Sequence, residues 1–216
     1  MKKYVKANLF PIIVEMIFII SCFFVPREYF IYTNFCFLLM LAIYFWYRKD
    51  FSLKEWLHNL KSGKAFWKHV VFTALSLIGA FVITTVLENI FSNFNTSMIK
   101  LRVNSWITLI IFAMSTVFLP PIVEETFYRK NMISFENKVV LIITTLLGML
   151  MFALEHALAV WGILLTMIWA LPLSISYIKT KNVYVPMTAH FICNLFVNGM
   201  DVVFSIIAML SMEKVI

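Results

Sequence analysis

Residues 105–130 are SWITLIIFAMSTVFLPPIVEETFYRK, an almost uncharged run that ends in two adjacent carboxylates. A helix that crosses a bilayer needs about 20 apolar residues. Charged side chains within such a span are costly and usually face a cavity lined by protein. Glu124 and Glu125 stand at the end of this run, with Arg129 four positions after Glu125. The stretch therefore predicts a membrane helix that carries a polar site.

The composition extends this prediction to the whole chain. Of its 216 residues 62% are hydrophobic and only 13% are charged, and the mean hydropathy is +0.90. A soluble domain is closer to half apolar and a quarter charged. We therefore expect an all-α, polytopic membrane helix bundle that forms a single domain over residues 1–216. About eight spans are predicted, at Leu9–Val25, Phe30–Tyr47, Val70–Phe91, Ser105–Val123, Val139–Glu155, Leu158–Ile178, Val183–Val197 and Val202–Met212.

The distribution of basic residues predicts the orientation. With the N-terminus placed in the cytoplasm, all but three of the 18 Lys and Arg residues fall on the cytoplasmic side, Lys214 among them. The exceptions are Arg27, Lys100 and Arg102. The positive-inside rule favours this arrangement, with both termini cytoplasmic. It accounts for the net charge of +7 without a nucleic acid partner.

The longest cytoplasmic loop, residues 48–69, mixes lysines with tryptophan and phenylalanine. Such a mixture is typical of an amphipathic segment lying on the anionic inner leaflet. A plain connector that obeys the topology would have the same charge, so both interpretations stay open. The first span is expected to be uncleaved, because no small-residue cleavage site follows it.

Helical spacing separates the two glutamates. Glu125 and Arg129 are four residues apart, so they share one face of a helix and can form an ion pair. Glu124 points about 100° away from Glu125 and is left free. The alternative is an ordinary salt bridge at a cytoplasmic helix end.

Two further clusters lie in later spans. Phe152 and His156 are four residues apart, and so are His190 and Asn194. A lone histidine in an apolar helix is more often a core residue than a ligand, and polar contacts between membrane helices are common. Glu155, beside His156, is expected to be a helix-end group that faces solvent.

Together these residues suffice for amide hydrolysis. A carboxylate can take a proton from water, and imidazole or amide groups can donate to the developing oxyanion. Alternatively, Glu124, His156 and His190 could hold a zinc ion with a water in the open position. The HExxH helix of the common zinc proteases does not occur.

The three clusters resemble the motifs of the CPBP intramembrane proteases, a family that includes the type II CAAX prenyl endopeptidases. The family motifs EExxxR, FxxxH and HxxxN occur here as EETFYR, FALEH and HFICN. They cover a core of residues 105–199, about the C-terminal half. Lys130 departs from the pattern, because many members have glycine after the arginine.

The resemblance implies an intramembrane endopeptidase with a cavity open toward the cytoplasm. It implies a substrate that is a membrane-associated peptide or protein, such as a bacteriocin leader or a pheromone precursor, in a bacterial plasma membrane. In the favoured interpretation no metal is required, and zinc at Glu124, His156 and His190 is the alternative. The implied catalytic residues are Glu124, His156, His190 and Asn194, with Glu125, Arg129 and Phe152 in support.

Two other functions stay open: a non-catalytic scaffold or self-immunity regulator with the same fold, and a transporter. A transporter would show a charged path and inverted repeats, and neither is visible in the sequence.

A question of depth also stays open. His156 lies roughly 27 Å along its helix from Lys138, whereas Glu124 is expected near the cytoplasmic end of its own helix. Either the helix continues past Pro120 and Pro121 and holds its glutamates at mid-depth, or the next helix begins below the membrane surface.

Overall fold

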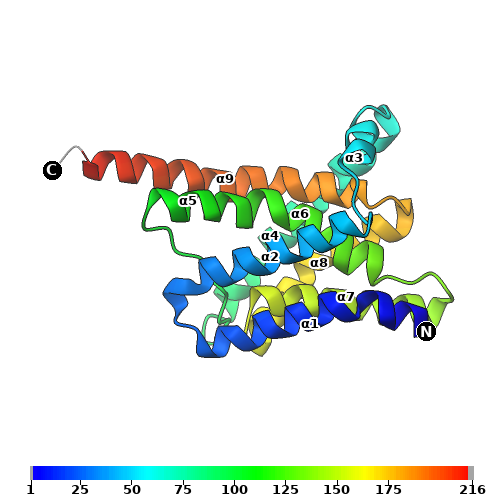
Figure 1. The fold of residues 1–216 in the computed structure, drawn as a ribbon, viewed down its shortest axis with the longest axis horizontal. Coiled ribbons are helices and arrows are strands. Elements are labelled where there is room, and N and C mark those ends of the chain that lie inside the picture. The colour runs from blue at the N-terminus through cyan, green and yellow to red at the C-terminus, as the bar shows by residue number, and fades with distance from the viewer. Residues whose placement is uncertain (1, 214–216) are drawn as a thin grey trace.

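The computed structural model describes residues 2–213, with side chains described for residues 8–211. Seven long helices run along one common direction, and the short helix α3 lies at one end of the bundle (Figure 1). The elements are α1 (Lys2–Phe24), the 3-10 turn η1 (Arg27–Tyr29), α2 (Phe30–Tyr47), α3 (Leu53–Leu60), α4 (Lys64–Ile90), a continuous helix from Trp106 to Asn131, α7 (Lys138–His156), α8 (Val160–Thr180) and α9 (Tyr184–Glu213).

The outer surface of the bundle is apolar. Within the described part of the chain, six helices are long and apolar enough to cross a membrane, and Asn8–Phe24 is a shorter apolar segment. Large apolar side chains are exposed on several helices: Phe24 is 83%, Val160 75% and Phe196 71% exposed. Lipid tolerates such a surface, provided that backbone groups are satisfied within the helices. The prediction of an all-α membrane bundle is therefore confirmed.

The two spans predicted at Val183–Val197 and Val202–Met212 are wrong as separate helices, because both belong to α9. The predicted break spans residues 198–201, but Asn198 and Asp201 lie within the helix and line a cavity. One crossing fewer changes the topology. The beginning of α1 and the end of α9 lie at opposite ends of the bundle (Figure 1), so the two ends of the chain do not share one side as expected. Lys214 lies outside the described residues.

The helix that begins at Trp106 continues past Val123 to Asn131. It consists of α5 (Trp106–Ala113), the π-helical turn η2 (Met114–Phe118), α6 (Leu119–Glu124) and the π-helical turn η3 (Glu125–Asn131). In a regular α-helix the amide of residue 120 would bond the carbonyl of Thr116, but Pro120 has no N–H. The side-chain amide of Asn198 donates to that carbonyl instead, at 2.9 Å. The prolines thus widen the helix without ending it.

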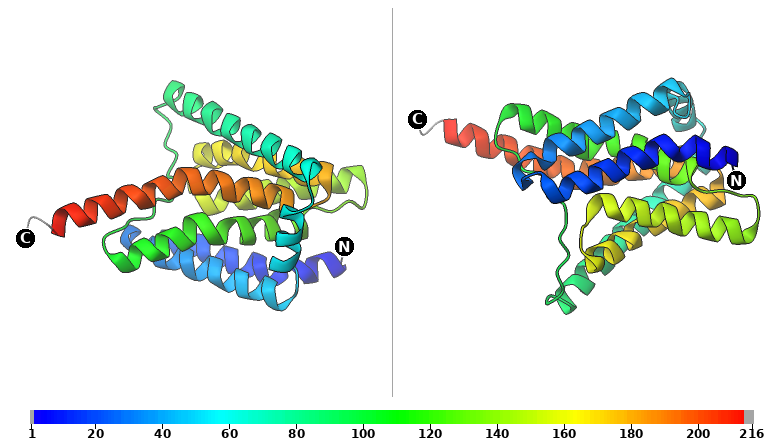
Figure 2. Two further views of the ribbon diagram at one scale, coloured as in Figure 1. Left: turned by 90° about the horizontal axis from the view of Figure 1, so that it is seen from above. Right: turned by 60° about the horizontal axis from the view of Figure 1, so that its bottom comes forward.

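This helix lies at the centre of the bundle. α6 contacts both α2 and α9, while α4 packs against α8 and α9, and α7 against α8. Figure 2 shows the helix beside α9 over much of its length. The glutamates of α6 and η3 are therefore surrounded by protein.

The predicted loop 48–69 contains α3 and the first turn of α4. Side chains of α3 hydrogen bond to the first turns of α9 and to the loop before it, and this end of the bundle is closed. The position of residues 48–69 on the inner leaflet stays a prediction. The bonds run from Trp56 Nε1 to Thr188 Oγ1 at 2.8 Å, from Tyr184 Oη to Glu55 Oε2 at 2.9 Å and from Asn182 Nδ2 to Asn59 Oδ1 at 2.6 Å.

Candidate active site

The predicted pair of Glu125 and Arg129 is present and fully buried. Nη1 of Arg129 lies 3.3 Å from Oε1 of Glu125, and both side chains are almost completely inaccessible. Nη2 donates to the carbonyl of Ala170 at 3.4 Å, and the guanidinium carbon lies 4.7 Å from the ring centroid of Phe152. Phe152 therefore packs on the cation, an arrangement that the face of an aromatic ring favours.

His190 links the paired glutamate to the free one. Its Nδ1 lies 2.9 Å from Oε1 of Glu125, and a carboxylate oxygen accepts, so the hydrogen is on Nδ1. The other nitrogen, Nε2, lies 4.0 Å from Oε2 of Glu124. That oxygen of Glu124 is buried and has no hydrogen-bond partner among the described residues. Glu125 is thus engaged by Arg129 and His190, while Glu124 stays available.

His156, on α7, also bonds to the protein through Nδ1. Its Nδ1 lies 2.7 Å from the carbonyl oxygen of Phe152, which only accepts, so Nδ1 carries hydrogen. Its ring stacks on that of Phe152 with centroids 4.4 Å apart. In the neutral ring Nε2 is then an acceptor. Both imidazoles therefore fix Nδ1 against the protein and keep Nε2 for other partners.

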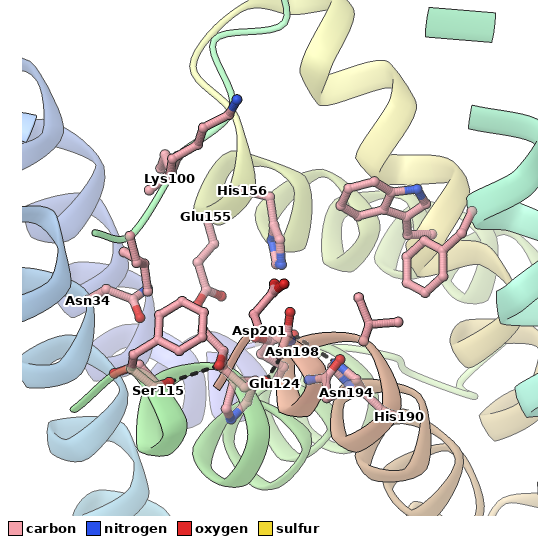
Figure 3. A pocket seen from close by; sticks show the side chains of 18 of the residues that line it. Asn34, Lys100, Ser115, Glu124, Glu155, His156, His190, Asn194, Asn198 and Asp201 are labelled. Carbon is pink, nitrogen blue, oxygen red and sulfur yellow. Dashed lines mark hydrogen bonds and ion pairs between the residues drawn. The ribbon is translucent and has the colours of Figure 1, made fainter. Parts of the chain in front are cut away.

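A cavity of about 950 Å³ joins these groups. Glu124, His156, His190 and Asn194 all line it. Figure 3 shows His156 on one wall and Asn194 with His190 on the helix that forms another. The helix continues past Pro120 and Pro121 and holds Glu124 inside the bundle. This is the first of the two arrangements considered for bringing Glu124 to the depth of His156.

Polar residues continue along α9 beyond the predicted motif. Asn198, Asp201 and Ser205 follow Asn194 at steps of four, three and four residues, and all line the cavity. Those steps place them on one face of a helix. This stripe was visible in the sequence as a helical period, but it coincided with the supposed break between two spans.

The cavity extends away from the basic end of the bundle. Its lining runs from Glu124 to the segment Ile99–Val103 and to Phe204 on the second half of α9. That segment lies in the loop after α4, at the end of the bundle opposite α3 (Figure 1). The side of the membrane on which the cavity opens stays a prediction.

The expectation that Glu155 faces solvent is wrong. It is 5% exposed, accepts a hydrogen bond from the hydroxyl of Tyr128 at 2.9 Å, and lines the cavity. Glu15 of α1 is completely buried nearby, and neither of its carboxylate oxygens has a hydrogen-bond partner among the described residues. The cavity lining thus includes the carboxylate of Glu155 in addition to that of Glu124, and Glu15 is buried outside that lining. A charged residue within an apolar run was the available signal for both Glu15 and Glu155.

The donor types of Glu124, His156 and His190 suit zinc, since each imidazole presents Nε2 while its Nδ1 bonds to a protein oxygen. Their positions do not. Among the described residues no three His, Cys, Asp or Glu side chains converge closely enough to hold a metal ion. We therefore derive no step through a metal.

Comparison with known proteins bears on the same segment. Residues 104–196 match the family model described as "Type II CAAX prenyl endopeptidase Rce1-like". Neither the comparison with curated proteins nor that with solved structures found a match. The matched segment begins just before α5 and ends within α9, so it contains all three motifs. Over residues 104–196 the chain is therefore similar to the Rce1-like type II CAAX prenyl endopeptidases of the CPBP family.

Proposed function

We propose that the protein is an intramembrane endopeptidase that hydrolyses a peptide bond in a membrane-associated peptide or protein. One observation carries the proposal. Glu124, His156, His190 and Asn194 line a single cavity, in which Glu124 has an unpartnered carboxylate oxygen among the described residues. The family match supports protease chemistry at this place in the chain.

The groups have complementary parts in the reaction. Glu124 takes a proton from water, and the water oxygen forms a bond to the carbonyl carbon of the peptide. The amide of Asn194 donates to the oxyanion that develops. Nε2 of one imidazole, His190 beside Glu124, accepts the second hydrogen of the water and orients it, and His156 lines the opposite wall of the cavity. When the carbon–nitrogen bond breaks, the proton held by Glu124 passes to the leaving amine, and the products are a carboxyl group and an amine.

Glu125, Arg129 and Phe152 keep this arrangement in place. The ion pair neutralises one of the two adjacent carboxylates, and Glu125 orients His190 through Nδ1. Phe152 packs on the Arg129 guanidinium and on the His156 ring. A substrate such as a bacteriocin leader or a pheromone precursor suits a cavity that is apolar along much of its lining and polar along α9.

The test compares peptides from cells that carry the wild-type protein or the Glu124→Ala variant, measured by mass spectrometry. Glu55→Gln is the control, because Glu55 is a carboxylate at the opposite end of the bundle. We expect a peptide whose cleaved form disappears with Glu124→Ala and persists with Glu55→Gln at equal protein levels. Identical peptides in all three strains would refute the proposal and favour a non-catalytic scaffold or self-immunity regulator. Adding a chelator to the purified reaction then tests the metal alternative.

A further inference from the structure

A second cavity, of about 350 Å³, lies beside the catalytic one. Arg27, Lys100 and Arg102 line it, together with the backbone turn at Asn95–Met98. Arg27 begins the turn between α1 and α2, whereas the other two basic residues come from the loop between α4 and α5. We name this cavity, with its three cations, the outer basic pocket. Its cations are the three that the sequence placed on the less basic side of the membrane.

These cations form no ion pair among the described residues. Within the described part of the chain, no acidic side chain lies within 4.0 Å of Arg27, Lys100 or Arg102 as an ion-pair partner. No aspartate or glutamate lines the pocket either. Like charges repel one another across a small space, although here water screens part of the repulsion because all three side chains are exposed. An anion between them removes that repulsion, and arginine suits an oxyanion because its guanidinium binds both oxygens of a carboxylate.

The loop that carries Lys100 and Arg102 is attached to the catalytic residues. The amide of Ile99 donates to the carbonyl of His156 at 2.8 Å, and the amide of Leu158 donates to the carbonyl of Ser97 at 3.1 Å. The loop packs closely against α8 at Gly162, where a side chain would not fit. An added Cβ there would lie 2.1 Å from the carbonyl oxygen of Thr96. The outer basic pocket is therefore held in a set position relative to His156.

The two cavities share lining residues, Ile99 and Lys100. A chain bound along the polar stripe of α9 can therefore reach the outer basic pocket. We propose that this pocket binds a carboxylate of the substrate peptide, either an acidic side chain or the C-terminus, and thereby positions the peptide bond beside Glu124. The inference rests on the proposed function, and it favours a peptide over a lipid phosphate because the pocket adjoins the catalytic cavity and is bonded to His156.

The test measures binding rather than cleavage, with Glu124→Gln protein in phosphatidylcholine nanodiscs. The probe is a dansyl-labelled Ala–Leu octapeptide made with a free C-terminal carboxylate or with a C-terminal amide. We expect the acid to bind about tenfold more tightly than the amide, the worth of one charge-assisted hydrogen bond. Arg27→Gln with Arg102→Gln should abolish this preference. Lys54→Gln with Lys68→Gln, which removes the same charge at the opposite end, should retain it.

Equal binding of acid and amide, or a preference that survives Arg27→Gln with Arg102→Gln, overturns the proposal. A lipid site is a further outcome that overturns the proposal. In that case the two peptides bind alike, and phosphatidylglycerol raises the melting temperature of the protein only when both arginines are present. The variant Arg27→Lys with Arg102→Lys keeps both charges and should keep a preference, which separates loss of charge from loss of fold. Acid-selective binding without cleavage by the wild-type protein would refute the proposed function but not the pocket.

Discussion

The two ends of the bundle treat their polar side chains in opposite ways. At the end covered by α3, polar groups bond to one another, as Trp56 does to Thr188 at 2.8 Å. At the other, hollow end the cavity lining includes two groups without such partners, because both Ser115 Oγ and Glu124 Oε2 are buried and unpartnered among the described residues. Buried polar groups are normally satisfied. The closed end covered by α3 thus pairs its polar groups within the protein, whereas the hollow end leaves two of them unpaired within the described part of the chain.

Arg129 lies where the two ends meet. Its contacts with Glu125, Ala170 and Phe152 belong to the packed interior, yet they position the groups that face the cavity. The difference between the ends predicts different consequences for substitution. Changes at the hollow end should affect cleavage more than folding, and changes at the closed end should do the reverse.

The largest expected effect comes from Glu124→Gln. Loss of a general base lowers the rate by a factor on the order of 10²–10⁴, and we expect kcat to fall within that range while denaturant unfolding in micelles changes little. Glu55→Gln removes a carboxylate from the closed end, where it accepts from Tyr184 at 2.9 Å, and should leave kcat unchanged. A similar loss of kcat in Glu124→Gln and Glu55→Gln would mean that the two ends of the bundle do not differ in function.

Arg129→Met should produce the largest loss of stability. Removing one partner of a buried ion pair costs about 3–5 kcal/mol, because the remaining charge is left uncompensated, and here that charge is on Glu125. The free energy of unfolding in micelles measures the loss. Arg129→Lys keeps the charge and should recover part of it. If Arg129→Met unfolds like the wild type, the ion pair contributes no stability to the junction.

Local spacing made part of this site predictable. Glu125 and Arg129 are four residues apart on a helix, so their contact follows from the helical repeat alone. The same holds for Phe152 and His156, which stack. The long apolar runs were equally clear, because the thickness of a bilayer sets the length of a span.

The rest of the site could not be predicted, because a polar residue in an apolar run has two meanings. It marks a loop in water or a wall of a cavity, and only tertiary packing decides which. The gap predicted between the last two spans, at residues 198–201, belongs to the second class, because Asn198 and Asp201 line the cavity. Glu155 was expected to face solvent for the same reason. Its hydrogen-bond partner, Tyr128, lies on another helix, so the sequence alone does not reveal it.

Gly162→Ala should have an intermediate effect. The added Cβ would meet the carbonyl oxygen of Thr96 at 2.1 Å, so the loop before α5 must move away from α8. Overpacking of this kind costs about 1–3 kcal/mol. Gly79→Ala is the matched control, because nothing lies within 4 Å of its added Cβ and alanine favours a helix by up to about 1 kcal/mol. Thermal unfolding should separate the two variants in opposite directions, and equal melting temperatures would show that the loop is not held by this contact.

The smallest expected effects form a pair that tests the comparison directly. Thr188→Val deprives the Trp56 indole of its acceptor and should cost about 1 kcal/mol, the net worth of one hydrogen bond. Ser115→Ala removes a hydroxyl of similar burial that has no partner among the described residues, so its free energy of unfolding should stay close to that of the wild type. Denaturant unfolding of both variants in the same micelles provides the measurement. If Ser115→Ala costs as much as Thr188→Val, then Ser115 has a partner in the folded protein, such as an ordered water, and the hollow end is stabilised by bonds that its side chains do not form with one another.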